Sequence, residues 1–346
     1  MRNAAVLIAY LILAALLLFC PLVKCGANQN YMAPSNTLAI KGFWVIVVFF
    51  SHYSSYVELS GKADLPFIWI NSEIGQICVV MFLFYSGYGI WHSYQNKANY
   101  IKTFLKKRFF PTWVSFAICV LLFLIENMFL GIRYNFVDIL FSFTGWNSIG
   151  NSNWYMFVTF ALYILFFLCF RVFDNKNKKF GLTVYTALCL GLVAILYFTK
   201  ESWWYNTLLC FPAGMWYAAL KNRIDDLLFK RNKNYVLILI LSIVLLAGTY
   251  FLQQWHGVFF IIYAICFCIF TVVVTMKLTF NSKPLSFIGK HVFSIYILQR
   301  LFFNLGQHYG LNERPYLFFA LCLICTIMLA VLYDCVFDKY KQLLTK

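Results

Sequence analysis

The sequence predicts an all-α fold, a polytopic transmembrane helical bundle with about 10–11 spans. The 346 residues are 62% hydrophobic, 21% aromatic and only 12% charged, with a mean hydropathy of +0.75. A soluble domain is nearer half apolar and a quarter charged. Apolar runs of about 20 residues, long enough to cross the hydrocarbon core, recur along the whole chain. Basic residues gather in alternate connections between these runs, which is typical of membrane proteins.

Each predicted span is an apolar run bounded by Gly, Asn, Ser or charged residues, the usual residues of connections between helices. In chain order, the spans are expected near 4–23, 39–58, 74–93, 113–130, 153–170, 181–198, 204–220, 234–252, 257–276, 285–303 and 316–336.

The net charge of +16 is interpreted as a topology signal. Most Lys and Arg fall in connections that would share one side, above all in 97–108, 171–179 and 221–233. The positive-inside rule places that side in the cytoplasm, with the C-terminus inside and the N-terminus outside. A composition rich in Phe, Lys and Asn is typical of a protein from an AT-rich bacterial genome, and the expected location is the bacterial inner (plasma) membrane. Membrane lipids are therefore expected partners, and nucleic acid is not.

Residues 1–37 are expected to form an additional N-terminal transmembrane helix and linker, and residues 38–340 the main membrane domain. The basic start and apolar core of 1–23 also fit a signal peptide. A retained helix is favoured because no small-residue cleavage pattern is clear. The 12 Cys lie mostly inside spans, so neither a disulfide framework nor a metal site is expected, and Cys322 and Cys325 are interpreted as packing residues.

His52 is the most informative residue of the chain. It follows Lys41 by eleven positions in an apolar stretch, so both side chains share one helix face about 16 Å apart. A titratable side chain within a membrane span is costly and usually faces a functional cavity. Imidazole exchanges a proton near neutral pH, which suits a general base acting on a hydroxyl group. The alternative is a structural histidine that is hydrogen bonded inside the bundle.

Two further features could support chemistry. The phosphates of a cytoplasmic cofactor could be bound by Lys106, Lys107 and Arg108. Of these, Arg108 is best suited, because a guanidinium can donate two parallel hydrogen bonds to a pair of phosphate oxygens. Contact with anionic lipids would explain the same cluster. Glu126 should face inward, where it could orient His52 if their helices are neighbours. Ser86 lies beside glycines that would also suit a helix-packing seam.

Five short motifs follow one another along the chain: Lys41 with His52, MFLFYSGY at 81–88, KKRFFP at 106–111, Asn153-Trp154-Tyr155, and Gly289 with Ser294 and Tyr296-Ile-Leu-Gln299. Together they resemble the acyltransferase-3 family of integral membrane O-acyltransferases over about residues 40–305. Among the motif residues, Lys41 stands where the family usually has an arginine and Gln299 where it has a late histidine.

The resemblance implies transfer of an acyl group, most often acetyl, from cytoplasmic acetyl-CoA (acyl-CoA) to a hydroxyl of a cell-surface or lipid-linked glycan, without a metal. His52 would be the general base or would briefly carry the acyl group itself. The implied sites are catalytic residues His52 and Glu126; acyl-CoA-binding residues Lys41, Ser86, Tyr88, Lys107 and Arg108; and acceptor-binding residues Ser55, Trp154 and Tyr296.

Two other function classes remain open from the sequence. A transporter or flippase for lipid-linked saccharides would share the many spans and the intramembrane polar residues. It would also be expected to show repeated halves with broken helices, and no clear repeat is visible. An inactive, scaffold-like relative would fit the replacements at Lys41 and Gln299.

Overall fold

The computed structural model describes residues 22–24, 30–59, 61, 64–174 and 177–345. Residues 4–21 of the first predicted span lie outside the described residues, so the prediction of an N-terminal membrane helix also lies outside them. Residues Leu22–Lys24 form strand β1, which pairs antiparallel with β2 (Leu278–Phe280), Val23 opposite Thr279. This ribbon is the only sheet among the described residues.

The described chain is otherwise helical, which confirms the all-α polytopic prediction. Within the described ranges, seven helical segments are long and apolar enough to cross a membrane. The long helices are α2 (Pro34–Tyr53), α4 (Ile77–Asn96), α6 (Phe110–Phe129), α8 (Trp154–Phe173), α9 (Lys178–Thr199), α10 (Cys210–Phe229), α11 (Asn232–Leu252), α12 (Gly257–Thr275), α14 (Val292–His308) and α15 (Pro315–Thr345).

Three details of the predicted spans are wrong. Helix α2 ends at Tyr53, before the predicted end of its span at 58, so His52 lies in its last turn. The segment predicted at 285–303 is divided at His291 into α13 (Lys283–Lys290) and α14. Helix α10 begins at Cys210 and continues well past the predicted end of its span. Two short helices, α3 (Leu65–Ile74) and α7 (Phe136–Ser142), were not expected.

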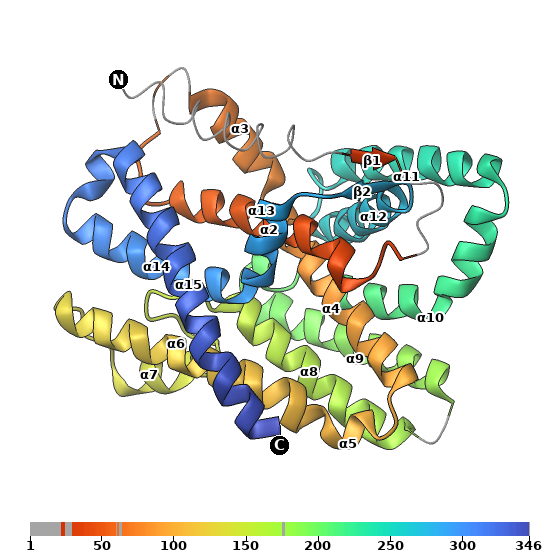
Figure 1. The fold of residues 1–346 in the computed structure, drawn as a ribbon, viewed down its shortest axis with the longest axis horizontal. Coiled ribbons are helices and arrows are strands. Elements are labelled where there is room, and N and C mark those ends of the chain that lie inside the picture. The colour runs from red at the N-terminus through yellow and green to blue at the C-terminus, as the bar shows by residue number, and fades with distance from the viewer. Residues whose placement is uncertain (1–21, 25–29, 60, 62–63, 175–176, 346) are drawn as a thin grey trace.

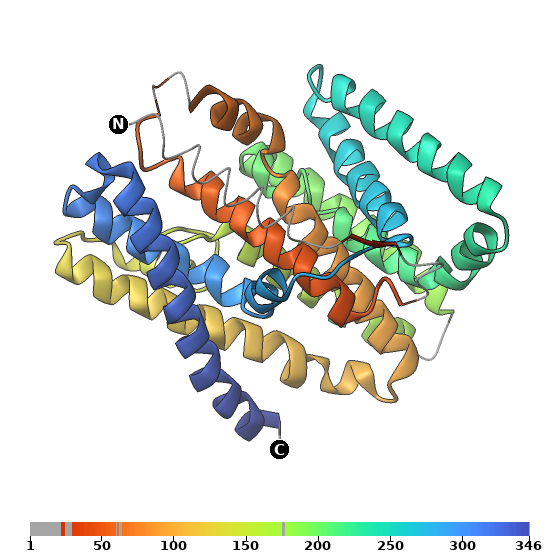
Figure 2. The ribbon, with the colours of Figure 1, turned by 45° about the horizontal axis from the view of Figure 1, so that its top comes forward.

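Helices α2 and α4 occupy the centre of the bundle, where they pack against each other (Figures 1 and 2). Helix α10 packs along α4 on one side, and the hairpin of α11 and α12 lies beyond it. On the other side of α2 lies the pair of α14 and α15, and α14 also contacts α6. Any chemistry that needs α2, α4 and α14 together is therefore confined to the middle of the molecule.

Glycine allows the central helices to approach one another closely. A Cβ at Gly42 of α2 would lie 1.9 Å from the carbonyl oxygen of Leu285 in α13. A Cβ at Gly87 of α4 would lie 2.0 Å from the carbonyl oxygen of Phe211 in α10. Small residues at such crossings let helix backbones touch, as membrane helices often require. These contacts also fix the positions of Lys41 and Ser86, which are the sequence neighbours of the two glycines.

The basic loop forms part of one long helical segment that runs through α5 (Tyr100–Phe104), the π-helical turn η3 (Leu105–Phe109) and α6. Within η3, the Phe110 N–H bonds to the carbonyl of Leu105, one residue farther back than in an α-helix. Pro111 follows at the start of α6, and a proline ring clashes with the carbonyl four residues before it. We attribute the wide turn to Pro111. Such π-turns are frequent at functional sites.

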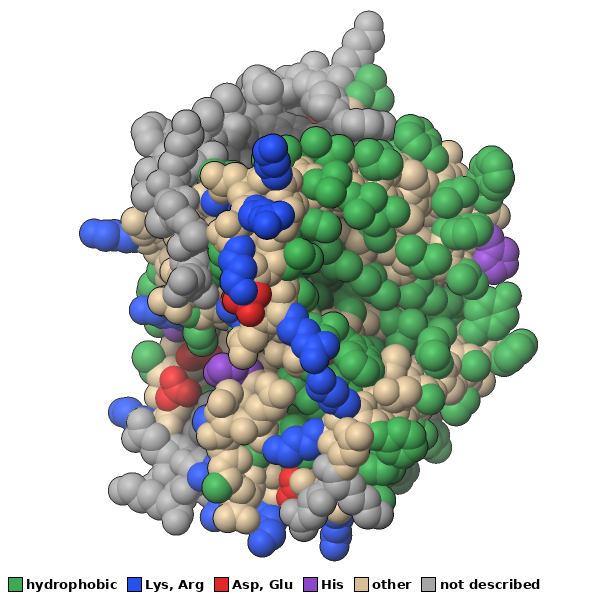
Figure 3. Space-filling model, turned by 90° about the vertical axis from the view of Figure 1, so that its right-hand side faces the viewer, with side chains coloured by type: hydrophobic (Ala, Val, Ile, Leu, Met, Phe, Trp, Pro, Cys, Tyr) green, Lys and Arg blue, Asp and Glu red, His purple; other side chains and the backbone are tan. Residues whose placement is uncertain are grey.

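The surface has the pattern expected of a membrane protein. Lys and Arg side chains form a band beside a broad hydrophobic surface on the face that carries the α10 and α11 ends (Figure 3). Exposed large apolar residues extend along α11, among them Leu237, Val244 and Phe251. An exposed apolar surface of this extent suits lipid contact.

Candidate active site

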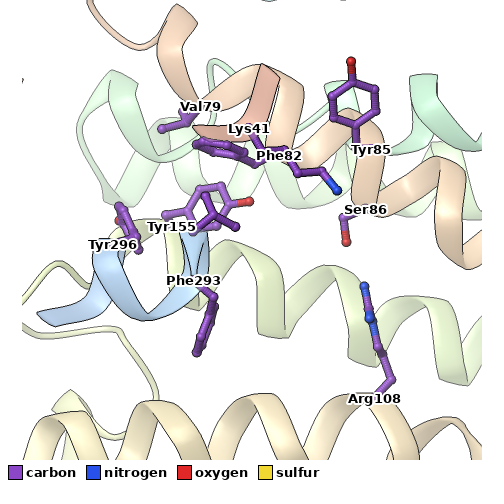
Figure 4. A pocket seen from close by; sticks show the side chains of 10 residues that line it. Lys41, Val79, Phe82, Tyr85, Ser86, Arg108, Tyr155, Phe293 and Tyr296 are labelled. Atoms are coloured by element: carbon purple, nitrogen blue, oxygen red, sulfur yellow. The ribbon is translucent and has the colours of Figure 1, made fainter. Parts of the chain in front are cut away.

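A cavity of about 220 Å³ lies between α2, α4, α14 and the η3 turn. Lys41 and Arg108 approach it from opposite sides and point toward the hydroxyl of Ser86 (Figure 4). Neither cation belongs to the ion pairs of the described residues. Each instead lies against an aromatic ring, Lys41 Nζ 5.5 Å from the Tyr85 centroid and Arg108 Cζ 5.9 Å from the Tyr163 centroid.

Two unpaired cations at one cavity form a site for an anion. Like charges in a bundle interior repel each other, and burial is costly for each unless a counter-charge is present. The Arg108 side chain lies between helices, yet it is exposed because it lines the cavity. Phosphate or carboxylate oxygens are the ligands that such a pair would bind best.

A second, larger cavity of about 800 Å³ adjoins the first. Lys41, Tyr85 and Arg108 line both cavities, so the two meet at the pair of cations. Tyr88 and His92 of α4 also line the larger cavity, where their rings stack at 6.0 Å with an interplanar angle of 6°. Its walls are mostly polar, and it opens on the side where the sequence gathers its basic residues.

A polar cluster supports the rim of the larger cavity. The Tyr31 hydroxyl donates to Asp225 Oδ1 at 2.7 Å and lies 2.6 Å from the Tyr217 hydroxyl. Lys221 pairs with Asp225 and lies 4.7 Å from the Tyr31 ring centroid. Burial, and then the neighbouring Tyr217, raise the pKa of Tyr31, so its hydroxyl remains a hydrogen-bond donor at neutral pH. Lys221 itself lines the cavity.

His52 lies next to the smaller cavity but is not among its lining residues. Its ring is 6.2 Å from that of Tyr296, which does line the cavity, and Tyr296 is 5.3 Å from Tyr155 on the opposite wall. The Nδ1 atom of His52 is buried without a hydrogen-bond partner. An unpaired imidazole nitrogen can accept a proton or a ligand hydrogen bond.

Beyond His52, a hydrogen-bond chain joins the turn after α2 to helices α14 and α6. The Tyr56 hydroxyl donates to Asn304 Oδ1 at 2.8 Å, and Asn304 Nδ2 donates to Glu126 Oε2 at 3.2 Å. The loop before α8 lies over this chain, with Gly150 close to Asn304. Glu126 is thus held by Asn304 of α14, and its other oxygen, Oε1, is buried without a hydrogen-bond partner.

The structure brings together many, but not all, of the predicted site residues. Lys41, Ser86, Arg108 and Tyr296 line the smaller cavity, and Tyr88 lines the larger one. Lys107 is exposed and lines neither cavity, although it is adjacent to Arg108 in the sequence. The Ser55 hydroxyl donates to the His52 carbonyl at 2.6 Å, so it closes the end of α2. Trp154 packs against two clusters of buried apolar side chains, and its ring centroid lies 5.8 Å from that of Tyr155.

Several lining residues were not identified from the sequence. Aromatic residues are too common in this chain for Tyr85, Tyr155 or Phe293 to stand out, although each lines the smaller cavity. Tyr155 belongs to the Asn-Trp-Tyr motif, which could have directed attention to it. Tyr56 and Asn304 lie far apart in sequence, so only the fold shows that they meet.

No group of three potential metal ligands occurs in the part of the chain that the structure describes. The two cavities are lined by cations, hydroxyls and aromatic rings together with the imidazole of His92, and the imidazole of His52 lies beside the smaller one.

Comparison with known proteins identifies the family of the chain. A family model described as an acyltransferase domain, that of acyltransferase family 3, matches residues 38–334 and so covers most of the chain. Separate searches of curated proteins and of solved structures found no match. The matched region contains every residue that lines the smaller cavity, together with His52. The chain belongs to the acyltransferase-3 family and is a membrane acyltransferase.

Proposed function

We propose that this protein moves an acetyl group from cytoplasmic acetyl-CoA to a hydroxyl of a cell-surface or lipid-linked glycan. The observation that carries the proposal is the pair of unpaired cations, Lys41 and Arg108, where a large polar cavity meets a small one. The small cavity reaches Tyr296, whose ring lies beside His52. Donor and acceptor can therefore approach one another from opposite sides of the bundle.

In this proposal the CoA portion of the donor occupies the larger cavity. Its phosphates pair with Lys41 and Arg108, and Tyr88 provides an aromatic surface. The acetyl thioester then extends into the smaller cavity past the Ser86 hydroxyl. The larger cavity faces the cytoplasm in this arrangement, because the basic connections lie at the same end. The membrane is proposed to be the bacterial inner membrane.

His52 acts as the general base. One of its ring nitrogens takes the proton of the acceptor hydroxyl as the hydroxyl oxygen attacks the thioester carbonyl carbon. The carbon–sulfur bond then breaks, CoA leaves as the thiolate, and the proton held by His52 passes to that thiolate, which restores the neutral imidazole. Tyr296 contacts both the imidazole and the cavity, so it is proposed to orient His52 and the acceptor. Glu126 acts as a positioning residue through Asn304 and Tyr56.

The remaining predicted residues have lesser parts in this proposal. Ser55 supports the end of α2 beside the acceptor. Trp154 holds Tyr155 against Tyr296 at the acceptor side. Lys107 contributes long-range attraction for the donor phosphates from the exposed surface of the η3 turn.

A transfer assay tests the proposal. Purified protein in nanodiscs is incubated with radiolabelled acetyl-CoA and the glycan fraction of its own envelope. Replacement of His52 by Ala should lower kcat by about 10²–10⁴-fold, the usual contribution of a general base, with acetyl-CoA binding unchanged. The control is His308→Ala, which changes an exposed histidine at the far end of α14.

Wild-type turnover by the His52→Ala protein would remove this residue from the mechanism. Absence of any acetyl transfer by the wild-type protein, together with saccharide movement across proteoliposomes, would favour a transporter instead.

A further inference from the structure

Arg300 is the one charged side chain on the surface of α14 that faces the end of α2. It follows Tyr296 by four residues and precedes Asn304 by four, so the three share one helix face. Helix α14 packs against α2. His52 in the last turn of α2 faces Tyr296, and Tyr56 in the turn that follows α2 bonds to Asn304. Arg300 therefore lies between the His52–Tyr296 contact and the Tyr56–Asn304 hydrogen bond.

The charge of Arg300 has no carboxylate counterpart among the described residues. The three ion pairs found there are Lys221–Asp225, Lys230–Asp226 and His291–Asp334. The Nε atom of Arg300 is buried without a hydrogen-bond partner. The guanidinium lies within electrostatic range of His52, Tyr56 and Tyr296, and the Tyr56 side chain is its hydrogen-bond partner. Its neighbour Glu126 is held by Asn304 instead.

An unpaired guanidinium at this depth is costly. Intramembrane cations normally pair with an anion, and a buried donor without a partner loses its solvation without compensation. The side chains around Arg300 are half-buried rather than closed off, since His52, Tyr56, Arg300 and Asn304 all keep partial exposure. These side chains therefore remain partly accessible from outside the bundle. The planar fork of Arg suits a carboxylate or a phosphate.

We propose that Arg300 binds an anionic group, a carboxylate or a phosphate, of the acyl acceptor and so selects acidic glycans over neutral ones. The inference rests on the proposed function, since it assigns the acceptor to the outer side of His52. The bound anion lies about one helical turn from Tyr296, which leaves a hydroxyl of the same or the adjacent sugar near the imidazole.

A matched pair of ligands tests the assignment without relying on acyl transfer. One probe is a glucuronate-containing tetrasaccharide, and its control is the same tetrasaccharide after reduction of the carboxyl groups to alcohols. A glycerol phosphate oligomer provides the phosphate arm. Binding to the full chain in nanodiscs of zwitterionic lipid is measured by calorimetry for the wild type, Arg300→Gln and Arg300→Lys. Arg314→Gln is the control variant, because Arg314 is an exposed arginine beyond the end of α14.

Arg300→Gln should raise the Kd of at least one acidic probe by roughly 10–100-fold, the usual effect of a lost charge-assisted hydrogen bond. Arg300→Lys should raise it less, and the carboxyl-reduced tetrasaccharide should bind all proteins alike. Retained binding of CoA by each variant shows that the bundle is folded. Equal affinity of the wild type for acidic and reduced probes would overturn the proposal.

Two further outcomes separate this site from its rivals. If Arg300→Gln changes the Kd of the acidic probes only in nanodiscs with anionic lipid, Arg300 contacts lipid headgroups and the acceptor assignment fails. If the wild type binds an acidic probe through Arg300 but never acetylates it, the anion site stands and the proposed transfer reaction fails.

Discussion

At the scale of single residues, three cations of the described chain lie at the cavities or beside His52 and take part in none of its ion pairs. Lys41 and Arg108 border the cavities, and Arg300 lies near His52. Aromatic faces partly compensate the first two. Since such interactions are weaker than a charge pair, these positions reduce stability and are expected to serve ligands.

Arg108 and Lys107 form a matched pair of neighbouring cations. Replacement of Arg108 by Met should raise the KM for acetyl-CoA by roughly 10–100-fold, because a charge-assisted contact to phosphate is lost. Replacement of Lys107 by Met should change it by less than about threefold, because an exposed charge is screened by salt. Initial rates at varied acetyl-CoA give both values. Equal effects of the two variants would show that only the net charge of the loop matters.

At the scale of elements, the helix crossings define the site. Gly87 and Gly89 lie two residues apart in α4, yet a Cβ at Gly87 would clash with the Phe211 backbone and one at Gly89 would meet nothing within 4 Å. Gly87→Ala should therefore lower the Tm of the purified protein, since the α4–α10 crossing must separate. Gly89→Ala should leave the Tm unchanged or raise it, because Ala favours helix over Gly by about 1 kcal/mol. Thermal unfolding of both variants in the same detergent gives the two Tm values. An equal decrease in Tm for both variants would refute the close α4–α10 contact at Gly87.

The π-turn η3 offers a second test at this scale. Pro111→Ala removes the clash with the carbonyl of Lys107, so residues 105–110 can return to ordinary α-helical bonding. Loss of the wide π-helical turn would change the rotation of this helical segment and so turn the Arg108 side chain away from the cavities. The expected result is a higher KM for acetyl-CoA with the Tm equal to or above that of the wild type. A lower Tm with an unchanged KM would mean that the wide turn serves stability alone.

Elements and sites differ in how far the sequence predicts them. Hydropathy predicted the apolar helices because lipid exposure requires long apolar runs, as in α11 and α12. It misplaced α10 because the helix continues into a charged segment held by Lys221–Asp225 and Lys230–Asp226 pairs four residues apart. The break at His291 has no proline or glycine at that residue to signal it.

Within the site, Lys41 and Ser86 were both expected from the motifs to bind acyl-CoA, and they line one cavity because each lies beside a glycine at a helix crossing. Their binding of acyl-CoA stays a prediction. The sequence could not separate Arg108 from Lys107, since the wide turn decides which side chain points inward. It also could not predict that Arg300 faces His52, because this depends on the packing of α14 against α2.

At the scale of the whole molecule, the cavities give the bundle a direction. The larger, polar cavity and the basic η3 turn lie at one end, whereas Glu126, Asn304 and the loop before α8 lie at the other. A reaction between a cytoplasmic donor and an outer acceptor requires the first end to face the cytoplasm. The positive-inside rule independently gives the same orientation.

Labelling of single added cysteines tests this orientation. Lys106 in η3 and Glu313 in η5 (Leu311–Glu313) are both exposed and lie in segments assigned to opposite sides. In intact cells, a membrane-impermeant maleimide should label Glu313→Cys but not Lys106→Cys. After the inner membrane is permeabilised, both should react. The unmodified chain, with its own cysteines, provides the background to subtract. Labelling of Lys106→Cys in intact cells would place the cation pair on the outer side, where acetyl-CoA is absent, and the proposed reaction would then have no donor.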